Sequence, residues 1–404
     1  MSLPLAGIRV LDLSRVLAGP VCCQFLADLG ADVVKVERPG TGDDTRQWGP
    51  PFVEGDGPSA YYLSANRGKR SLALDLDQPS GRAVLRRLLE RADVMVENFL
   101  PAAREKFGLS PERLAAINPR LVSASISGFG RIGPLADQPG YDLVIQATSG
   151  LMSITGEPDG VPMKVGVALS DIIAGLYAAA SVLAGLVGRS TGQPGRAFDL
   201  ALADCTLASL VNVAQAALVT GERPRRYGNA HAQIVPYEVF ATSDGHLVLA
   251  VGNDRQWQRF CAVASRQEWA NDPRFATNPA RVRNRDALVP AIKALVATMP
   301  TDDWLRLLDE AEVPHAAVLP LDTVLTGQQA AAREMVVEVQ DRAGRRYHLL
   351  GSPVHWAGET RVIPAAPPAL GQHSEEVLRE WLATSDQELV GLRASRTIEQ
   401  ASRS

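Results

Sequence analysis

The 404-residue sequence predicts an α/β protein in which a doubly wound parallel sheet is joined to a second, smaller domain. Three observations support this fold class. Apolar β runs alternate with segments of helical spacing through residues 7–130, and each helix leads into a further strand, which indicates parallel strands with right-handed crossovers. The polar segment TGERPRRYGNAHAQ at 220–233 then separates this part from a region of different character.

The first strand is predicted in GIRVLDL, residues 7–13, and it ends before the breakers Gly19 and Pro20. VCCQFLADL at 21–29 has apolar residues at helical spacing and stops at Gly30. ADVVKVE at 31–37 resumes as a strand. These segments form a βαβ unit, so the two strands are expected to be parallel.

The alternation continues with a strand in SLALDL (71–76), a helix in 79–92 and a strand in DVMVEN (93–98). SPERLAAI at 110–117 predicts a helix capped by Ser110, and LVSASIS at 121–127 predicts a strand that ends at a Gly-Phe-Gly turn. The ligand crevice of such a sheet lies at the carboxyl ends of its strands.

An apolar run at 171–188 predicts a buried helix, and 200–218 predicts another long helix. Residues 237–316 begin with a hairpin that turns at Asp244-Gly245. We therefore expect a large domain at 1–220, a small domain at 228–316, and a return segment at 317–404 that completes the large domain. The polar tail at 393–404 is expected to fray.

The composition is that of a soluble globular protein, with 46% hydrophobic and 21% charged residues and a formal net charge of −4. This charge disfavours a nucleic-acid partner. The start of the sequence lacks the pattern of a signal peptide, so a cytoplasmic location is expected. The run at 171–188 is rich in Ala and Gly and begins with a carboxylate, which favours a core helix over a membrane span. The four cysteines have no metal-ligand spacing and are expected to be buried thiols.

Nicotinamide binding is disfavoured, because LSRVLAGP follows the first strand in place of the glycine-rich GxGxxG. Glu37 ends the second strand, where a dinucleotide fold binds ribose, but Arg38 follows it directly. A different set of polar and basic residues lies at or near strand ends. They could neutralise phosphates in one crevice or form a solvated rim, and they are Arg15, Arg38, Asn66, Arg67, Lys69, Arg70, Asn98 and Lys106.

Asp171 lies in KVGVALSDIIAGLY, where a coil meets an apolar helix. From local sequence it is a candidate helix cap. A carboxylate at a helix N-terminus is also held ionised by the helix dipole, as a carboxylate nucleophile requires, so the two interpretations are compatible. By itself, His231 in GNAHAQ is typical of a surface histidine.

Taken in order, several segments make this chain resemble the class III CoA-transferase family, which includes formyl-CoA and carnitine CoA-transferases. The resemblance covers nearly the whole chain. It is most specific in the segments GIRVLDLSRVLAGP, LGADVVKVERPGTGDDTR, NRGKRSLALDL, DVMVENF, PGYDLVIQATSG and VALSDIIAG. The resemblance implies a Rossmann-like large domain built from both chain ends, a small middle domain, and two ring-shaped subunits interlocked as a homodimer.

The resemblance also implies roles for individual residues. Asp171 corresponds to the nucleophile of the family, and Tyr141 and Asp142 fall near the thioester. His231 is expected near the substrate, because YGNAHAQIVPYEVF looks like that of members acting on larger acids, including dicarboxylates. The residues that correspond to CoA-binding positions are Arg15, Arg38, Lys69, Asn98, Phe99 and Lys106.

The chain departs from formyl-CoA transferase in having Leu17 in place of a glutamine and in lacking a glycine-rich covering loop, which disfavours formate and oxalate as its substrates. The expected reaction moves CoA from an acyl-CoA to a free acid through an aspartyl anhydride and an aspartyl-CoA thioester, with no metal or ATP. Two alternatives stay open: an α-methylacyl-CoA racemase, and a non-catalytic CoA-binding protein.

Overall fold

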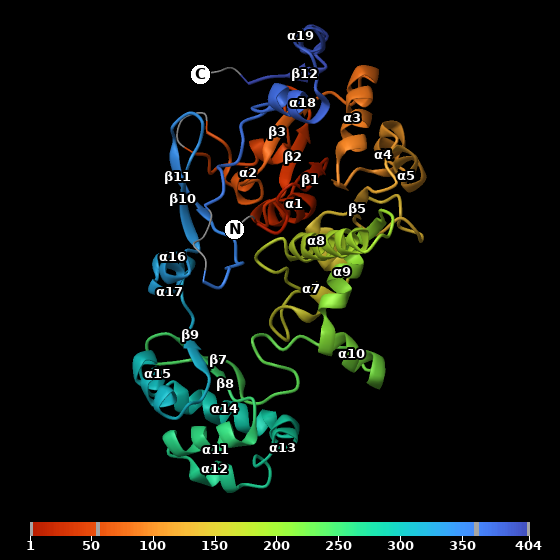
Figure 1. Cartoon of the computed structure of the whole chain (residues 1–404). Helices are drawn as coiled ribbons and strands as arrows, with labels where there is room; N and C mark the ends of the chain where they lie inside the picture. Colours follow the sequence, from red (N-terminus) through yellow and green to blue (C-terminus); the bar gives the residue numbers. More distant parts are fainter. Residues whose placement is uncertain (1–2, 54–56, 359–362, 402–404) are drawn as a thin grey trace. The chain divides into compact units, whose positions relative to one another are not determined.

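The computed structural model describes residues 3–53, 57–358 and 363–401, and it divides into two compact units (Figure 1). The first unit comprises Met1–Ser149, Val165–Leu210 and Gln328–Ser404, and the second comprises Gly150–Lys164 and Val211–Gly327. Each unit is described by itself. The domain boundaries expected near residues 220 and 316 stay predictions.

A seven-stranded sheet in the order β12-β3-β2-β1-β4-β5-β6 forms the centre of the first unit. The strands β1 to β6 are parallel, and β12 joins the edge antiparallel to β3. This confirms an α/β fold with a parallel central sheet. The strand bounds are β1 Arg9–Asp12, β2 Asp32–Glu37, β3 Arg70–Leu74, β4 Val94–Glu97, β5 Val122–Ser127, β6 Ala197–Ala201 and β12 Ile398–Glu399.

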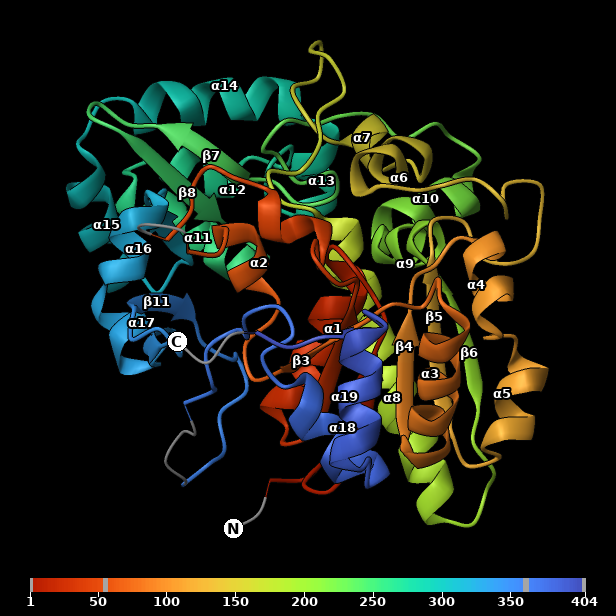
Figure 2. The ribbon, with the colours of Figure 1, turned by 90° about the horizontal axis from the view of Figure 1, so that it is seen from above.

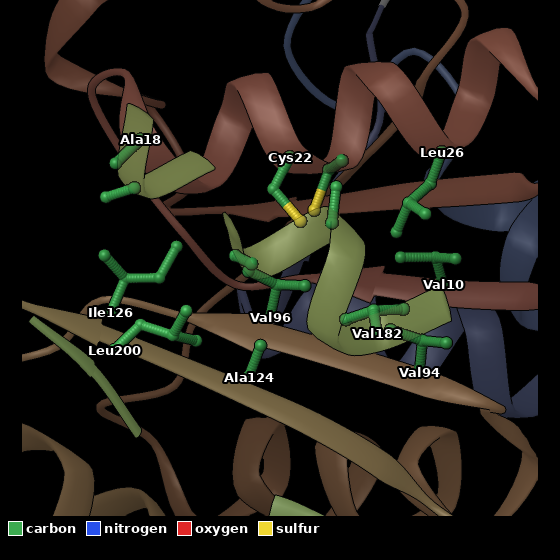
Figure 3. Packing of buried hydrophobic residues seen from close by; sticks show 14 of the residues in the cluster. Val10, Ala18, Cys22, Leu26, Val94, Val96, Ala124, Ile126, Val182 and Leu200 are labelled. Atoms are coloured by element: carbon green, nitrogen blue, oxygen red, sulfur yellow. The ribbon is translucent and has the colours of Figure 1, made fainter. Parts of the chain in front are cut away.

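Helices cover both faces of this sheet because its strands are apolar on both sides. On one face, α1 (Ala18–Asp28) and α8 (Leu169–Ser190) pack over Val10, Val94 and Val96 (Figure 3). On the other face, Leu11 and Met95 contact a second core that α3 (Pro79–Arg91) and α18 (Ser374–Leu382) complete (Figure 2). Smaller elements of this unit are η1 Asp44–Gln47, α2 Ala60–Ser64, α4 Pro101–Phe107, α5 Pro111–Ile117, α6 Asp142–Thr148, α9 Leu202–Ser209, α17 Gln328–Ala332, α19 Asp386–Ala394, and the hairpin β10 Val336–Gln340 with β11 Arg346–Leu350.

Small residues let α8 approach the rest of the fold closely. The helix has the length and composition of a membrane span, but its buried face of Gly175, Ala178, Ala179 and Gly185 packs on α1 and β5. A Cβ atom added at Gly185 would lie 2.7 Å from Val122 on β5. This agrees with the core helix predicted from the sequence.

The second unit is built on a three-stranded antiparallel sheet of β7 (Tyr237–Ala241), β8 (His246–Ala250) and β9 (His315–Ala317). The hairpin predicted at Asp244-Gly245 is confirmed, since Thr242 bonds with Gly245 across the turn. Two buried tryptophans, Trp257 and Trp304, lie in its core. Its helices are α7 Leu151–Ile154, α10 Val211–Thr220, α11 Asp254–Val263, α12 Gln267–Asn271, α13 Asn278–Arg283, α14 Arg285–Val296, α15 Thr301–Glu310 and α16 Leu321–Thr326.

Three features differ from the sequence prediction. The helix expected at 200–218 is divided at Val211, whose φ of +28° ends α9 and begins α10. The strand β6 precedes it and was not predicted, because its pattern is half exposed and polar at Asp199. The tail expected to fray instead contributes β12, where Ile398 is buried and pairs with Leu74.

Candidate active site

Two cavities lie at the carboxyl ends of the parallel strands in the first unit. We call them the Asp171 cavity, of about 330 Å³, and the Arg38 cavity, of about 210 Å³. Arg15, Asp44 and Phe99 line both, so the two cavities are adjacent. This is where ligands bind in doubly wound sheets, because the strand order reverses between β1 and β4.

The loops that follow β1 and β4 are hydrogen-bonded to each other where the strand order reverses. The backbone N–H of Arg15 donates to Asn98 Oδ1 at 2.9 Å, and Asn98 Nδ2 donates to the Arg15 carbonyl at 2.8 Å. The next residue, Val16, has φ of +70°, which is unusual for a β-branched side chain. Its N–H is bound by Asp43, at 3.3 Å from either carboxylate oxygen, and Asp43 in turn pairs with the buried Lys35. These bonds fix the backbone that leads into α1.

Asp171 is the third residue of α8, and its carboxylate lines the larger cavity. Burial raises the pKa of Asp171 to about 7, the negative charge of Asp142 adds to the rise, and a hydrogen bond from the backbone N–H of Ala18 opposes it. The cap of α8 is Ala168, so Asp171 is not the cap residue. Burial thus opposes the ionised form that was expected at this helix N-terminus, and the role of Asp171 as a nucleophile stays a prediction.

Close packing of α8 on α1 brings Ala18 to Asp171. Gly175 lies one helical turn after Asp171, and a Cβ atom there would lie 2.6 Å from the carbonyl oxygen of Ala18 and 3.2 Å from Val21. A glycine is therefore required at 175 for the first turn of α1 to approach the first turn of α8. A similar approach at the mouth of the cavity requires Gly128 and Gly140, where a Cβ atom on Gly128 would lie 2.7 Å from the Cα of Gly140.

Two arginines line the Asp171 cavity. Arg104 and Arg131 share one buried carboxylate, Glu97, which also accepts a bond from Ser125. Arg131 also pairs with Asp199 at 3.6 Å, so two guanidinium groups face two carboxylates here. Burial and the charge of Arg104 lower the pKa of Arg131, and the charges of Glu97 and Asp199 oppose this. Arg104 and Arg131 were not predicted, because neither directly follows a predicted strand.

The Arg38 cavity combines aromatic and basic side chains. Phe99 and Phe107 meet edge to face, with ring centroids 5.1 Å apart, and Lys106 lies over the Phe107 ring. Lys106 also forms an ion pair with Asp77, and the hydrogen bond from Lys106 lowers the pKa of that carboxyl. Arg38 lines the same cavity and is exposed. Thus five of the predicted CoA-binding residues line the two cavities, namely Arg15, Arg38, Asn98, Phe99 and Lys106.

Lys69 does not line either cavity. Its ammonium group is fully buried and donates to Asp12 at 2.9 Å, to the Pro20 carbonyl at 2.9 Å and to Asn66 at 3.0 Å. With its three donors satisfied by the protein, Lys69 has none left for a phosphate. In this structure Lys69 contacts neither cavity, and its expected role in binding CoA stays a prediction.

Arg67 and Arg70 are also turned away from the crevice. Arg67 pairs with Asp28 at the end of α1, and Arg70 pairs with Asp32 at the start of β2. The strand β3 begins at Arg70, so residues 66–69 precede the strand and lie, with Arg70, at the amino edge of the sheet. The crevice is at the opposite, carboxyl edge, and the sequence pattern did not separate the two edges.

Tyr141 and Asp142 have different environments. Tyr141 lines the Asp171 cavity and is 65% exposed, so its side chain is accessible. Asp142 begins α6 and is held by protein groups: it accepts from the N–H of Ser170 at 2.9 Å and from Gln146 Nε2 at 2.7 Å. Gln146 was not singled out from the sequence, although its spacing of four residues from Asp142 on a helix was a signal.

His231 belongs to the second unit. It lines a cavity of about 600 Å³ there, formed by α10 and residues 222–233, and its ring lies edge to face on Tyr237. Its Nδ1 accepts the N–H of Gln233 at 3.0 Å. Its expected place near the substrate stays a prediction.

Among the residues that the structure describes, no group of three His, Cys, Asp or Glu side chains is arranged to hold a metal ion. The four cysteines are buried and unpaired, as expected. Burial raises the pKa of Cys23 well above its usual range. A buried thiol of raised pKa is a poor nucleophile.

Two adjacent cavities at the switch point of a parallel sheet are typical of an α/β protein that binds its ligand at the carboxyl ends of the strands. The family model for CoA-transferase family III matches residues 5–374, and the chain belongs to this family. It is therefore an enzyme, a CoA-transferase, and enzymes of this type use acyl-CoA as a substrate.

The chain is similar along most of its length to known members. It is 44% identical over 381 residues to succinate–glutarate CoA-transferase of Agrobacterium fabrum, covering 93% of this chain and 95% of that one. It is 39% identical over 397 residues to succinyl-CoA:glutarate CoA-transferase of Mus musculus, covering 98% and 91%. The crystal structure of a CAIB/BAIF family protein from Brucella suis matches with a TM-score of 0.82 at 41% identity, covering 94% of this chain and all of that one.

Proposed function

We propose that this enzyme moves CoA from an acyl-CoA to a free carboxylic acid through covalent intermediates on Asp171. The observation that carries the proposal is the position of this carboxylate, which lines the Asp171 cavity near the first backbone N–H of α1. A carboxylate nucleophile needs to reach the substrate, and its place in the cavity lining supports this.

CoA occupies both cavities in this proposal. The nucleotide end lies in the Arg38 cavity, where Phe99 and Phe107 offer aromatic faces and Arg38 and Lys106 offer positive charge to the phosphates. The pantetheine arm passes Arg15, which lines both cavities, and brings the thioester to Asp171. The CoA-binding part is then a Rossmann-like domain built from both ends of the chain, with the small domain between them.

The reaction runs in four steps. Asp171 attacks the thioester carbonyl, and the C–S bond breaks to give an acyl-aspartyl anhydride and CoA thiolate. The thiolate attacks the aspartyl carbonyl, which releases the donor acid and leaves an aspartyl-CoA thioester. The acceptor carboxylate repeats both steps in reverse, so the thioester bond is conserved without ATP. The backbone N–H of Ala18 favours the charged form of the Asp171 carboxylate, and we assign it to the oxyanion that forms on the aspartyl group.

We propose dicarboxylic acids as substrates, with a succinyl or glutaryl group on one side of the exchange. The names of the Agrobacterium and mouse relatives support this choice. The guanidinium groups of Arg104 and Arg131 on the cavity wall also support it, because the CoA ester of a dicarboxylic acid keeps one free carboxylate, which a guanidinium group binds well.

The interlocked homodimer, the cytoplasmic location and the absence of nucleic-acid and membrane partners are part of the same proposal. Exposed apolar side chains in each unit support an oligomer, since monomers expose few such groups together. They include Leu176 and Tyr177 on α8 in the first unit, and Leu218 and Val219 on α10 in the second. Light scattering of the purified protein tests the dimer.

The variant Asp171→Ala tests the nucleophile. We expect it to fold and to bind CoA but to transfer no CoA from succinyl-CoA to glutarate. Asp204→Ala is the matched control, because Asp204 is also the third residue of a helix, α9, and is exposed outside the Asp171 cavity. Transfer by Asp171→Ala at the rate of the control would refute the proposed mechanism.

A proton-transfer enzyme is the nearest alternative. A racemase needs an acid and a base on opposite faces of the α-carbon, and the sequence carries Tyr141 where the racemases that the chain resembles have a histidine. We expect no deuterium at the α-carbon of 2-methylbutanoyl-CoA in heavy water, and ready exchange of CoA onto an added acid. Deuterium incorporation without acid-dependent exchange would favour the racemase.

A further inference from the structure

The coil that leads into α8 is held by the short helix α6. Residues 165–168 are not helical, and Gly166 and Val167 are exposed, yet they precede Asp171 by only a few residues. The position of Asp171 therefore depends on what fixes this coil. Two α6 side chains one turn apart hold this region: Gln146 bonds to the coil, and Asp142 bonds to Ser170 at the start of α8.

Gln146 is fully buried and bonds at both ends of its amide. Its Oε1 accepts the N–H of Val165 at 2.9 Å. Its Nε2 donates to Asp142 Oδ2 at 2.7 Å and to the carbonyl of Val167 at 3.3 Å. The Gln146 amide thus bonds both to the coil at residues 165–167 and to the Asp142 carboxylate.

Asp142 continues the chain of bonds to the helix that carries Asp171. Its Oδ1 accepts the N–H of Ser170, one of the first N–H groups of α8, which have no partner within the helix. The path from Gln146 to Asp171 therefore has two branches. One runs through the backbone of residues 165–167, and the other runs through Asp142 and Ser170.

The bond between Gln146 and Asp142 also fixes the position of a negative charge that acts on Asp171. Asp142 contributes a negative charge next to Asp171, and the donor amide of Gln146 fixes where that charge lies. The other charged or titratable groups at this site are Arg15, Arg104, Arg131, Asp44, Asp137 and Tyr141, which line the cavity, and Tyr61, which also interacts with Asp171. Of these groups and Asp142, only Asp142 is bonded to Gln146.

We propose that Gln146 is a positioning residue for CoA transfer, which fixes the Asp171 carboxylate by clamping Asp142 and the coil at 165–167. The inference rests on the proposed role of Asp171 as the nucleophile. An amide is required because the clamp needs an acceptor for Val165 and a donor for Asp142 on one side chain. A hydrocarbon of the same length would leave the Val165 N–H and the Asp142 oxygen without these partners.

Two substitutions test the clamp. Gln146→Met keeps the length of the side chain and removes both kinds of bond, so kcat should fall by about tenfold to a hundredfold with little change in the KM for acyl-CoA. Gln146→Glu keeps the acceptor for Val165 but places a second carboxylate against Asp142. Its added negative charge should move the acid limb of the pH–rate profile to higher pH. Thr148→Ala is the matched control, because Thr148 lies on the same helix and its hydroxyl bonds only within α6.

The result expected is a loss in kcat for Gln146→Met and a shifted acid limb for Gln146→Glu, with the control unchanged. A wild-type kcat in Gln146→Met would overturn the inference. The inference would also be overturned by two results together. These are a loss of kcat in Gln146→Met that matches a smaller folded fraction, measured by circular dichroism and active-site titration, and an acid limb that does not move in Gln146→Glu. Failure of the nucleophile itself would appear separately, as transfer by Asp171→Ala.

Discussion

Activity should depend on pH through the ionisation of Asp171. Only the carboxylate form is a nucleophile, and its pKa is raised to about 7 by burial and by the charge of Asp142. Because the pKa is raised above the usual 3.8, the reactive form is lost as the pH falls through 7. With a pKa of about 7, the ionised fraction is about 9% at pH 6 and about 91% at pH 8. The structure thus predicts a rise of about tenfold in kcat/KM between these two values.

The assay is the initial rate of transfer from succinyl-CoA to glutarate, measured from about pH 5 to about pH 9, because kcat/KM reports ionisation in the free enzyme. CoA binding to Asp171→Ala over the same range is the control, since the 3′-phosphate of CoA also titrates, with a pKa of about 6. In Asp142→Asn the acid limb should move to lower pH, because the charge that raises the pKa of Asp171 is gone. A profile flat down to about pH 5 would refute the account of Asp171.

Four further outcomes are expected. Gly175→Ala should lower kcat strongly, because the added Cβ would displace the Ala18 backbone from Asp171. Gly188→Ala is the control, since a Cβ at this position on the same helix makes only ordinary contacts and kcat should not change. Steady-state kinetics of the two variants test this. Arg38→Ala with Lys106→Ala should weaken CoA binding and reduce its salt dependence in calorimetry. Lys69→Ala should instead lower the free energy of unfolding by about 3–5 kcal/mol, because it leaves Asp12 buried without its ion-pair partner. The structural role of Lys69 would be refuted if Lys69→Ala weakened CoA binding as much as the Arg38→Ala/Lys106→Ala variant and left the free energy of unfolding unchanged. Asp171→Asn should raise the free energy of unfolding at pH 8 by up to about 4 kcal/mol, as measured by urea denaturation. The reason is that the raised pKa of Asp171 lowers the stability of the protein as the pH rises from about 4 to about 7. No gain at about pH 8 would contradict the raised pKa of Asp171.

Much of the parallel sheet could be predicted from the sequence, because β1, β2, β4 and β5 are short apolar runs. They are separated by segments in which the apolar residues recur at helical spacing. The strand β12 could not, since two residues in a polar tail form it only by pairing with the edge of β3. The division at Val211 also escaped prediction, because both halves of 200–218 have good helix-forming composition and the break depends on tertiary contacts.

The site was predicted where strand ends alone determine position. Arg15 and Asn98 follow β1 and β4, so the strand order brings them together. Lys69 precedes β3 and Arg70 begins it, and a basic residue near a strand cannot be placed at the correct edge until the first residue of the strand is known. The raised pKa of Asp171 escaped prediction as well, because it results from burial and from Asp142, which lies 29 residues earlier in the sequence.

The covalent intermediate is the most direct test of the mechanism. The protein is mixed with succinyl-CoA in the absence of an acceptor, quenched in acid, digested and examined by mass spectrometry. The account predicts a peptide containing Asp171 that is heavier by one CoA less one water, with succinate released in equal amount, and no such peptide from Asp171→Ala. CoA attached to another residue, or active transfer with no modified peptide at any time point, would contradict it.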